Sequence, residues 1–291
     1  MEKEWKFPQI LEFEEPIFLR NLTLYPIVGK DGESFDALSI EEALDKKLAD
    51  IQELDIPDIN RLQLENRSPS PLLMLDGEEI IGSLQNRIIA TSTIIPARTK
   101  KSIRVICAEE GRWNELGGFK TGFCSYPKIR AILSQGIHKS NIQKRIWNEI
   151  SRKLTVSKIS SATSSMHDIY NSLEEEIARY IEGFKSLNHK TLGFIGCSKN
   201  QILGCDLFIS PSLYQKFEPK LIRAYALDAI EQQNIRTKAS DISRYFDELC
   251  SFLEQFKPRS NMKHIRIREK YFFGQAVAIK NRLIHLSIFP N

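Results

Sequence analysis

The sequence predicts an α+β protein, with an antiparallel, β-rich N-terminal part of sandwich or barrel type and a C-terminal part of helices and short strands. Apolar and β-branched runs of strand length, separated by Gly, Pro, Asn and Asp, fill residues 16–28 and 61–107. Apolar residues at helical spacing then dominate residues 128–256, and strand-type runs return at the C-terminus. We expect residues 1–125 and 126–291 to form these two parts, packed as one unit.

The composition is that of a globular protein. The chain has 291 residues, of which 42% are hydrophobic and 27% charged, and this length can bury a substantial core. The acidic first 16 residues lack the apolar segment of a signal peptide, so we expect a cytoplasmic protein that does not enter a membrane. The five cysteines include no CxxC pair, which favours reduced thiols over a disulfide framework or a zinc knuckle.

Charge is unevenly distributed along the chain. Residues 1–99 contain 10 Lys and Arg against 19 Asp and Glu, whereas residues 100–158 contain 13 against 4. A basic segment can attract nucleic acid or a phosphate-bearing ligand. No repeat of alternating basic and aromatic residues accompanies it. We therefore favour a solvated face, or one paired with the acidic N-terminal part, and do not expect nucleic acid as the main partner.

The N-terminal part is expected to contain one helix among strands. Residues 39–51 have helical apolar spacing after a Ser cap with a Glu nearby, which predicts that helix. Residues 72–82 are typical of two strands joined by an Asp-Gly hairpin turn. The other strands are expected at residues 61–71, 87–96 and 97–107, and at residues 16–28 as a strand pair or one bent strand.

The C-terminal part is expected to begin after a Gly-rich loop at residues 111–127. Residues 190–208 are typical of two short strands around Lys199 and Asn200, and the chain closes with three strands, with Asn281 in a tight turn between the last two. Helices are expected at 128–154 with a break near Gly136, at 164–187, at 209–233 with Ser210 as its cap and a kink or second start at Pro219, and at 240–256.

Residues 72–113 concentrate polar chemistry at three turns between core-like segments, more densely than any other stretch of the chain. The first turn has three carboxylates, the second has two amides and a guanidinium, and the third combines carboxylates with an Arg-Trp pair. In order along the chain, these residues are Asp76, Glu78 and Glu79; Gln85, Asn86 and Arg87; and Glu109, Glu110, Arg112 and Trp113.

The same stretch, written LLMLDGEE…G…QNR…P…C.E.GRW, resembles the ARPP family, the "ARG and rhodanese-phosphatase-superfamily-associated protein" domain. Gln143 and Trp147, the segment 203–230 and the C-terminal residues 285–290 are also similar, so the likeness covers about the whole chain. The resemblance implies a link to ADP-ribose or nucleotide-derivative metabolism, in a prokaryotic conflict or defence setting. It implies no established reaction. The family more often has Gln where this chain has Glu110, which favours Glu109 as the functional carboxylate.

The carboxylates of the three turns have a functional and a structural interpretation. A cluster of Asp76, Glu78, Glu79 and Glu109 could hold Mg²⁺ with a phosphate, or divide general acid and base roles. Alternatively, Asp76 is a hairpin residue and the glutamates are solvated strand faces. For Asp76 we favour the structural role. Glu79 and Glu109 stay open, because both lie beside apolar runs where burial without function is costly.

The Gln85-Asn86-Arg87 turn also has two interpretations. Its amides could recognise a ribose or base while the guanidinium binds a phosphate through two hydrogen bonds. In the structural alternative, Asn86 satisfies backbone groups and Arg87 pairs internally with Glu79 or Glu109.

The remaining candidates are weaker. Arg112 could bind a phosphate while the Trp113 ring stacks on an adenine or sugar face. Alternatively, Trp113 could be a core plug, a buried side chain beneath the Gly-rich loop. Cys107 lies in an alternating strand and is expected to be structural rather than nucleophilic. The scattered histidines predict no metal site. The basic segment 128–153 is the nucleic-acid candidate, although solvated helix faces have the same composition.

We expect a small-molecule site on the β-rich part for a phosphorylated nucleoside or an ADP-ribose-like ligand, which the protein binds or hydrolyses. Arg87 and Arg112 would hold the anion, and Trp113, Asn86 and Gln85 the sugar or base. Glu79 and Glu109 would be the catalytic pair, holding Mg²⁺ or the attacking water. The helical part would provide a homo-oligomer interface. The competing hypothesis is a non-enzymatic interaction or scaffold module in which these motif residues are structural, and nucleic-acid binding is the third.

Overall fold

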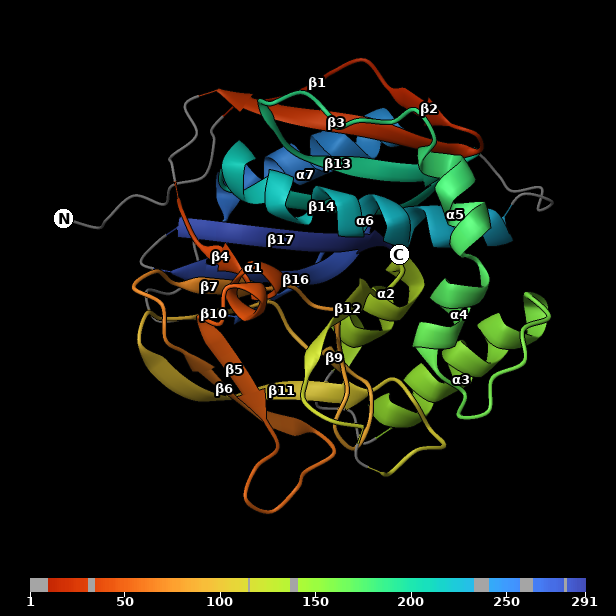
Figure 1. The fold of residues 1–291 in the computed structure, drawn as a ribbon. Coiled ribbons are helices and arrows are strands. Elements are labelled where there is room, and N and C mark those ends of the chain that lie inside the picture. The colour runs from red at the N-terminus through yellow and green to blue at the C-terminus, as the bar shows by residue number, and fades with distance from the viewer. Residues whose placement is uncertain are drawn as a thin grey trace. The chain divides into compact units, whose positions relative to one another are not determined.

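The computed structural model describes residues 10–30, 35–114, 116–136, 141–232, 241–256, 264–279 and 282–291. The chain divides into two compact units, which we call unit 1 (residues 1–35 and 177–291) and unit 2 (residues 36–176). Both combine antiparallel sheet with helices, which confirms the predicted α+β class (Figure 1). The division expected near residue 125 falls inside unit 2. In the described part of the chain, no helix is long and apolar enough to cross a membrane.

Unit 1 is built on an eight-stranded antiparallel sheet with the order β1-β3-β13-β14-β17-β16-β15, in which β2 also pairs with β3 (Figure 1). The strands are β1 (Ile10–Phe13), β2 (Ile17–Leu19), β3 (Leu22–Lys30), β13 (Thr191–Ser198), β14 (Gln201–Phe208), β15 (His264–Arg268), β16 (Phe272–Ile279) and β17 (Arg282–Pro290). Strands were expected in each of these segments except β1. The turn expected at Asn281 lies outside the described residues.

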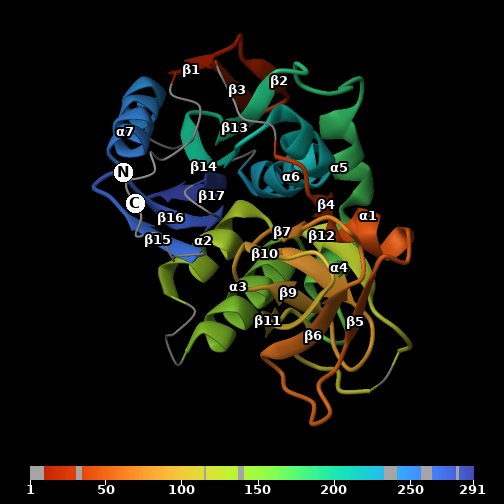
Figure 2. The ribbon, with the colours of Figure 1, turned by 90° about the vertical axis from the view of Figure 1, so that its left-hand side faces the viewer.

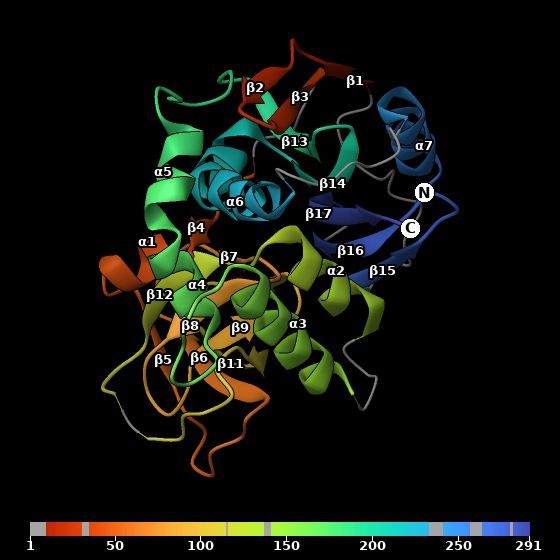
Figure 3. The ribbon, with the colours of Figure 1, turned by 90° about the vertical axis from the view of Figure 1, so that its right-hand side faces the viewer.

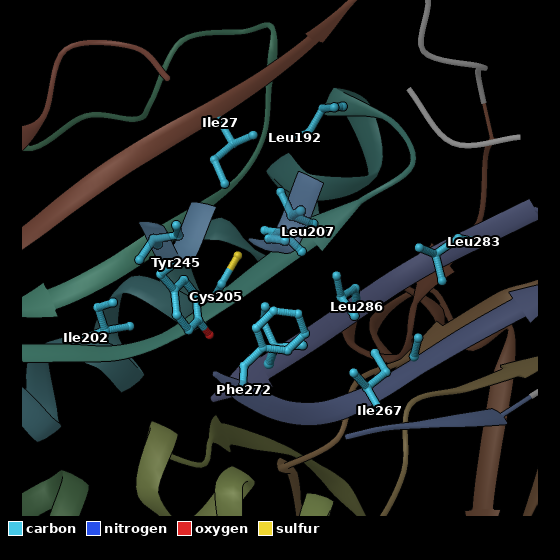
Figure 4. Packing of buried hydrophobic residues seen from close by; sticks show 14 of the residues in the cluster. Ile27, Leu192, Ile202, Cys205, Leu207, Tyr245, Ile267, Phe272, Leu283 and Leu286 are labelled. Carbon is cyan, nitrogen blue, oxygen red and sulfur yellow. The ribbon is translucent and has the colours of Figure 1, made fainter. Parts of the chain in front are cut away.

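Two helices of unit 1 pack on opposite faces of this sheet. Tyr225 of α6 (Pro211–Glu231) donates a hydrogen bond to Asp206 of β14, whereas Tyr245 of α7 (Ile242–Gln255) packs with Cys205, the preceding residue of that strand. Neighbouring residues of a strand point to opposite faces, so α6 and α7 cover different faces. Figure 4 shows the aliphatic and aromatic cluster on the α7 side, with Phe272 near its centre. Ser210 caps α6 as predicted, and the helix continues through Pro219.

Unit 2 contains a six-stranded antiparallel sheet with the order β12-β8-β9-β11-β6-β5 and a three-stranded sheet with the order β10-β7-β4 (Figure 2). The long strand β11 pairs with β6 along its first part and with β9 along its last three residues, so the sheet curls around the core. The strands are β4 (Leu38–Ser39), β5 (Ala49–Gln52), β6 (Arg61–Asn66), β7 (Leu72–Met74), β8 (Glu78–Ile81), β9 (Arg87–Ile89), β10 (Thr93–Ile95), β11 (Thr99–Cys107) and β12 (Lys120–Cys124).

Among the described residues, four helices lie wholly in unit 2, and a fifth crosses its boundary. They are α1 (Ile40–Asp45), α2 (Pro127–Gly136), α3 (Ile142–Val156), α4 (Met166–Ser172) and the boundary helix α5 (Glu174–Ile181). The helix pair predicted for residues 128–154, with its break near Gly136, is confirmed as α2 and α3. Figure 3 shows α3 running beside α4.

The helix predicted for residues 39–51 is too long. Ser39 caps α1 and forms the expected capping box with Glu42, but the helix ends at Asp45. Lys47 then adopts a positive φ of 56°, which turns the chain. Residues 49–52 form β5 because Ala49 and Ile51 alternate into the core while their backbone pairs with β6.

The Asp-Gly hairpin predicted between residues 72 and 82 is wrong. Strand β7 pairs with β4 and β10, whereas β8 pairs with β9 and β12. The chain therefore crosses from one sheet to the other at Gly77, whose φ of +83° permits the sharp change of direction. In the same way, the single strand expected at residues 87–96 is interrupted, and β9 and β10 belong to different sheets. The Gly-rich loop at residues 111–127 also contains β12, which pairs with β8.

Candidate functional site

The second and third polar turns meet in unit 2. The carboxylate of Glu109 accepts hydrogen bonds from the backbone N–H of Asn86 at 3.1 Å, from Nε of Arg112 at 2.9 Å and from the hydroxyl of Thr163 at 2.8 Å. Gln85 donates its amide to the backbone oxygen of Glu109 at 3.4 Å. Glu109 thus ties three separate segments together, and both of its oxygens are occupied by protein groups.

Arg112 is saturated by the same network. Its Nε and Nη2 contact Glu109, Nη2 also donates to the side-chain oxygen of Asn86 at 3.0 Å, and Nη1 donates to the backbone oxygens of Ser83 and Asn114. A guanidinium has five N–H groups, and these contacts use all of them. Arg112 is also buried. The predicted roles of Glu109 in catalysis and Arg112 in anion binding would require this network to open.

Arg87 has a different environment from Arg112. Its Nη1 donates to Glu53 at 2.7 Å, and the side chain is completely buried. The other two nitrogens, Nε and Nη2, have no hydrogen-bond partner among the described residues. These two nitrogens form the side edge of the guanidinium, which carboxylates and phosphates bind through two parallel hydrogen bonds. The structural alternative placed Arg87 in an ion pair with Glu79 or Glu109, whereas the structure pairs it with Glu53.

Two acceptor atoms of the same neighbourhood are also unpaired. Oε2 of Glu53 and Oε1 of Gln85 are buried and have no partner in the described structure. Glu53 follows β5, far from Arg87 in sequence, and Oε1 of the same carboxylate also accepts from the Ser83 hydroxyl at 3.1 Å. Nothing in the local sequence around Glu53 marked it, since only the curl of the sheet brings it to Arg87.

Cys107 is held as a structural residue. Cys107 is the cross-strand partner of Arg87. Its backbone N–H donates to Oε1 of Gln143 at 3.0 Å, and its backbone oxygen accepts from Nε2 of the same side chain at 2.8 Å. The Cys107 thiol donates to the backbone oxygen of Glu109. Burial is the main cause that raises the pKa of the Cys107 thiol, so the thiolate needed for nucleophilic attack is disfavoured. Gln143 in α3 therefore has an identifiable role: it fastens the helix to the end of β11.

The first polar turn is partly structural. Asp76 pairs with Arg130 of α2, with Oδ2 3.0 Å from Nε, and accepts a hydrogen bond from the Ser92 hydroxyl at 2.8 Å. Both members of the Asp76–Arg130 pair are completely buried. The Glu78 carboxylate accepts from the backbone N–H of Leu75 at 2.7 Å. Asp76 therefore anchors α2 to the segment where the chain crosses between the two sheets. Its role is structural, as expected, but it is not part of a hairpin turn.

Glu79, by contrast, contacts a titratable group. Its Oε2 lies 2.9 Å from Nδ1 of His167, at the start of α4, and accepts the backbone N–H of Phe123 at 3.2 Å. The Glu79 side chain is completely buried, whereas His167 is 25% exposed. The hydrogen bond to Glu79 is the main cause that raises the pKa of His167. The sequence gives no local signal for His167, because it stands alone in a helical segment 88 residues away from Glu79.

Glu79 and Arg87 lie on opposite faces of the six-stranded sheet. Ile80 and Arg87 are cross-strand partners in β8 and β9, so their side chains share one face, which also carries core residues such as Ile89. Glu79 precedes Ile80 and points to the other face, toward His167. The expected combination of Arg87 with Glu79 in one site is therefore not what the strand register produces.

Trp113 and the basic helices also differ from simple expectation. Trp113 is 52% exposed, so the core-plug alternative is wrong.

In the basic segment 128–153, Arg130 is buried against Asp76, and Lys153 is buried over the Tyr126 ring at 4.5 Å. Lys139 lies outside the described residues. Two of the seven Lys and Arg residues in this segment therefore contribute to the packing of the fold.

No group of three or more His, Cys, Asp or Glu side chains could hold a metal ion within the part of the chain that the structure describes.

Comparison with known proteins gives one result. The model of the ARPP-1 family, described as the ARG and Rhodanese-Phosphatase-superfamily-associated Protein domain, matches residues 10–289. No curated protein and no solved structure matches the chain. The match spans both units and includes every polar turn described above. The chain therefore belongs to the ARPP-1 domain family.

Proposed function

We propose that unit 2 binds a phosphorylated nucleoside or an ADP-ribose-like small molecule, and that Arg87 holds its anionic group. One observation carries this proposal: the side edge of a completely buried guanidinium has no protein partner among the described residues. Leaving a buried charged donor unpaired costs more than leaving a neutral one, at least about 1–3 kcal/mol. An oxyanion that accepts from Nε and Nη2 would remove that cost and gain geometric specificity.

The neighbouring acceptors suit the rest of such a ligand. Oε2 of Glu53 and Oε1 of Gln85 can only accept hydrogen bonds, so their natural partners are the hydroxyl and N–H groups of a sugar or base. Glu53 also neutralises part of the Arg87 charge, which selects for a ligand with both an anion and donors over a bare phosphate. Asn86 is less suited, because its side-chain oxygen already accepts from Gly82 and Arg112.

Trp113 and the family context support the nucleotide class. Trp113 is an exposed aromatic ring next to the saturated Arg112, and such rings stack on bases and sugars. The family name links the domain to rhodanese-phosphatase-type proteins, and the resemblance implies ADP-ribose or nucleotide metabolism in a conflict or defence setting. The proposal concerns binding at Arg87. It assigns no hydrolytic step there, because Glu79 faces away and Glu109 is occupied.

A thermal-shift screen tests the proposal with ADP-ribose, NAD, nucleotides and sugar phosphates, with and without Mg²⁺. A ligand at about a hundred times its dissociation constant should stabilise the fold by about 2.7 kcal/mol. The key variant is Arg87→Lys, which keeps a positive charge for Glu53 but removes the two parallel N–H donors at Nε and Nη2. We expect it to abolish the shift.

Arg67→Lys is the matched control, since Arg67 is 52% exposed and pairs only at the surface of the same unit. It should leave the shift intact. In the parent protein, the Nε–H resonance of Arg87 should move when the hit is titrated. A flat screen, or a hit that survives Arg87→Lys unchanged, would contradict the proposal.

The second candidate function is a non-enzymatic interaction module. The observation that favours it is the Glu109–Arg112 network, in which every donor of Arg112 and both oxygens of Glu109 bind protein groups. Motif residues whose polar groups all bind other protein groups stabilise the fold, and they have no hydrogen-bonding group left for a ligand. A flat ligand screen combined with severe destabilisation by Arg112→Lys would support this candidate.

A further inference from the structure

We propose that Glu79 and His167 form a general-base pair that activates water for the hydrolysis of a phosphodiester, at a site on the sheet face opposite to Arg87. The proposal is independent of the ligand site at Arg87, and neither requires the other. It assigns His167 as the catalytic residue, because Nε2 of its partly exposed side chain would touch the attacking water. Glu79 is the positioning residue, which acts through the imidazole.

The hydrogen bond between the two side chains fixes which nitrogen can act as a base. Oε2 of Glu79 is 2.9 Å from Nδ1 of His167, so Nδ1 donates and the neutral ring carries its lone pair on Nε2. Among the described residues, none forms a hydrogen bond with Nε2. The buried carboxylate holds the imidazole in this tautomer and stabilises the imidazolium formed after proton transfer, as the acidic member of a catalytic triad does.

The surroundings hold both side chains in place. The backbone N–H of Phe123 donates to the same Glu79 oxygen, and the Phe123 ring lies 5.0 Å from the imidazole, between centroids. Gly122 passes so close to Glu79 that a Cβ there would lie 2.2 Å from Oε2, so only glycine allows this approach. On the helix side, the Ser165 hydroxyl accepts the backbone N–H of His167. These contacts come from β8, β12 and α4.

The charges around His167 raise its pKa above the ordinary value for histidine. Glu79 first, and Asp168 to a smaller extent, raise its pKa, while partial burial and Lys120 oppose them, and the net direction is upward from 6.5. A general base is most effective when its pKa lies near the working pH. Oε1 of Glu79 is buried without a partner among the described residues, so the carboxylate retains an acceptor for a second donor.

The reaction balances without a cofactor. Water attacks phosphorus as Nε2 takes one of its protons, and a bond forms between phosphorus and the water oxygen. The bond from phosphorus to the leaving oxygen breaks, and Nε2 returns the proton to that oxygen. The products are a phosphomonoester and an alcohol or phenol.

One cation among the described residues, Lys120, lies on the same sheet face as Glu79. It is the cross-strand partner of Ile81, two residues along β8 from Glu79, so its charge can balance the single charge of a phosphodiester. A dianionic monoester usually requires several cations or metal ions. The Phe123 ring beside the imidazole favours a diester with a planar substituent.

The test uses the full-length protein with bis(4-nitrophenyl) phosphate as the probe, and release of nitrophenolate as the readout. We expect the parent protein to hydrolyse it, and His167→Asn to lower the rate by about 100-fold or more. Asparagine retains an N–H near the position of Nδ1 for Glu79 and lacks Nε2, so folding should persist. His189→Asn is the matched control at an exposed histidine and should leave the rate unchanged.

The pH profile separates catalysis from structure. In the parent, the rate should rise with pH through a midpoint above 6.5, as His167 loses its proton. Glu79→Gln removes the main cause of the raised pKa, so it should shift that midpoint downward and reduce the rate above it. A parent protein without hydrolysis above buffer, a folded His167→Asn variant with the parent rate, or a midpoint unmoved by Glu79→Gln would each overturn the proposal.

Discussion

Arg130 and Asp76 form an ion pair with Nε of Arg130 3.0 Å from Oδ2 of Asp76, and both side chains are completely buried. The pair joins α2 to the point where the chain crosses from β7 to β8. Gly77 packs directly on it, since a Cβ there would lie 2.8 Å from Cγ of Arg130. The motif residue that most resembles a hairpin signal is therefore part of an inter-element anchor.

Removing one member of this pair should be strongly destabilising. Asp76→Ala leaves the Arg130 charge buried without its main partner, and such losses cost about 3–5 kcal/mol. Urea denaturation should show this as a lower transition midpoint with an unchanged slope. The double variant Asp76→Leu with Arg130→Met should recover part of the loss. A surface control, Arg67→Ala, should change the free energy of unfolding by less than about 1 kcal/mol. Equal effects of Asp76→Ala and the control would contradict the anchor role.

The Glu109–Arg112 network should respond differently from Arg87. Arg112→Lys replaces five fixed N–H groups by three on one nitrogen, so several buried acceptors lose partners, and we expect a loss of about 2–4 kcal/mol. Glu109→Gln should also destabilise. Among the described residues, Arg87 has one side-chain partner, Glu53, so the effect of Arg87→Lys should appear mainly in ligand binding. Thermal unfolding of the three variants side by side measures this, and a larger loss for Arg87→Lys would reverse the two roles.

The stability of the protein should depend on pH through His167. Its pKa in the folded protein is raised above 6.5, so the stabilisation by its charged form is fully present below 6.5 and is lost as the pH rises through the folded pKa. The difference in unfolding free energy between the parent and His167→Asn should therefore be larger at about pH 6 than at about pH 9. Paired denaturation curves at the two pH values measure it. A difference that grows with pH would mean that the pKa of His167 is lowered.

Gly122→Ala should uncouple Glu79 from His167 while leaving both residues in the chain. The added methyl group would lie 2.2 Å from Oε2 of Glu79, so the carboxylate must move. We expect the pKa of His167, followed by its imidazole resonances in an NMR titration, to fall relative to the parent. Gly118→Ala is the control, in the loop just before β12, since a Cβ there meets no atom within 4 Å. A pKa unmoved by Gly122→Ala would show that the hydrogen bond does not depend on this approach.

Local chemistry in the sequence determined many elements of the fold. The capping residues Ser39 and Ser210 begin α1 and α6, and the Lys199-Asn200 pair turns β13 into β14. Alternation at Ile103 and Val105 predicted β11. These features depend on neighbours in the chain, so local patterns identify them. The sequence of residues 72–113 also identified the three polar turns. Two of these turns meet in the structure, where the backbone N–H of Asn86 donates to Glu109.

Only the tertiary structure decided what those turns do. The pairing of β8 with β9 puts Glu79 and Arg87 on opposite faces, although they are only eight positions apart in the chain. The partners that define their chemistry, Glu53 and His167, lie 34 and 88 residues away. Such pairings depend on strand register and on the packing of α4, which involve contacts far apart in sequence. The sequence by itself determined which residues have reactive groups, and the fold determined which of these groups are paired, buried or exposed.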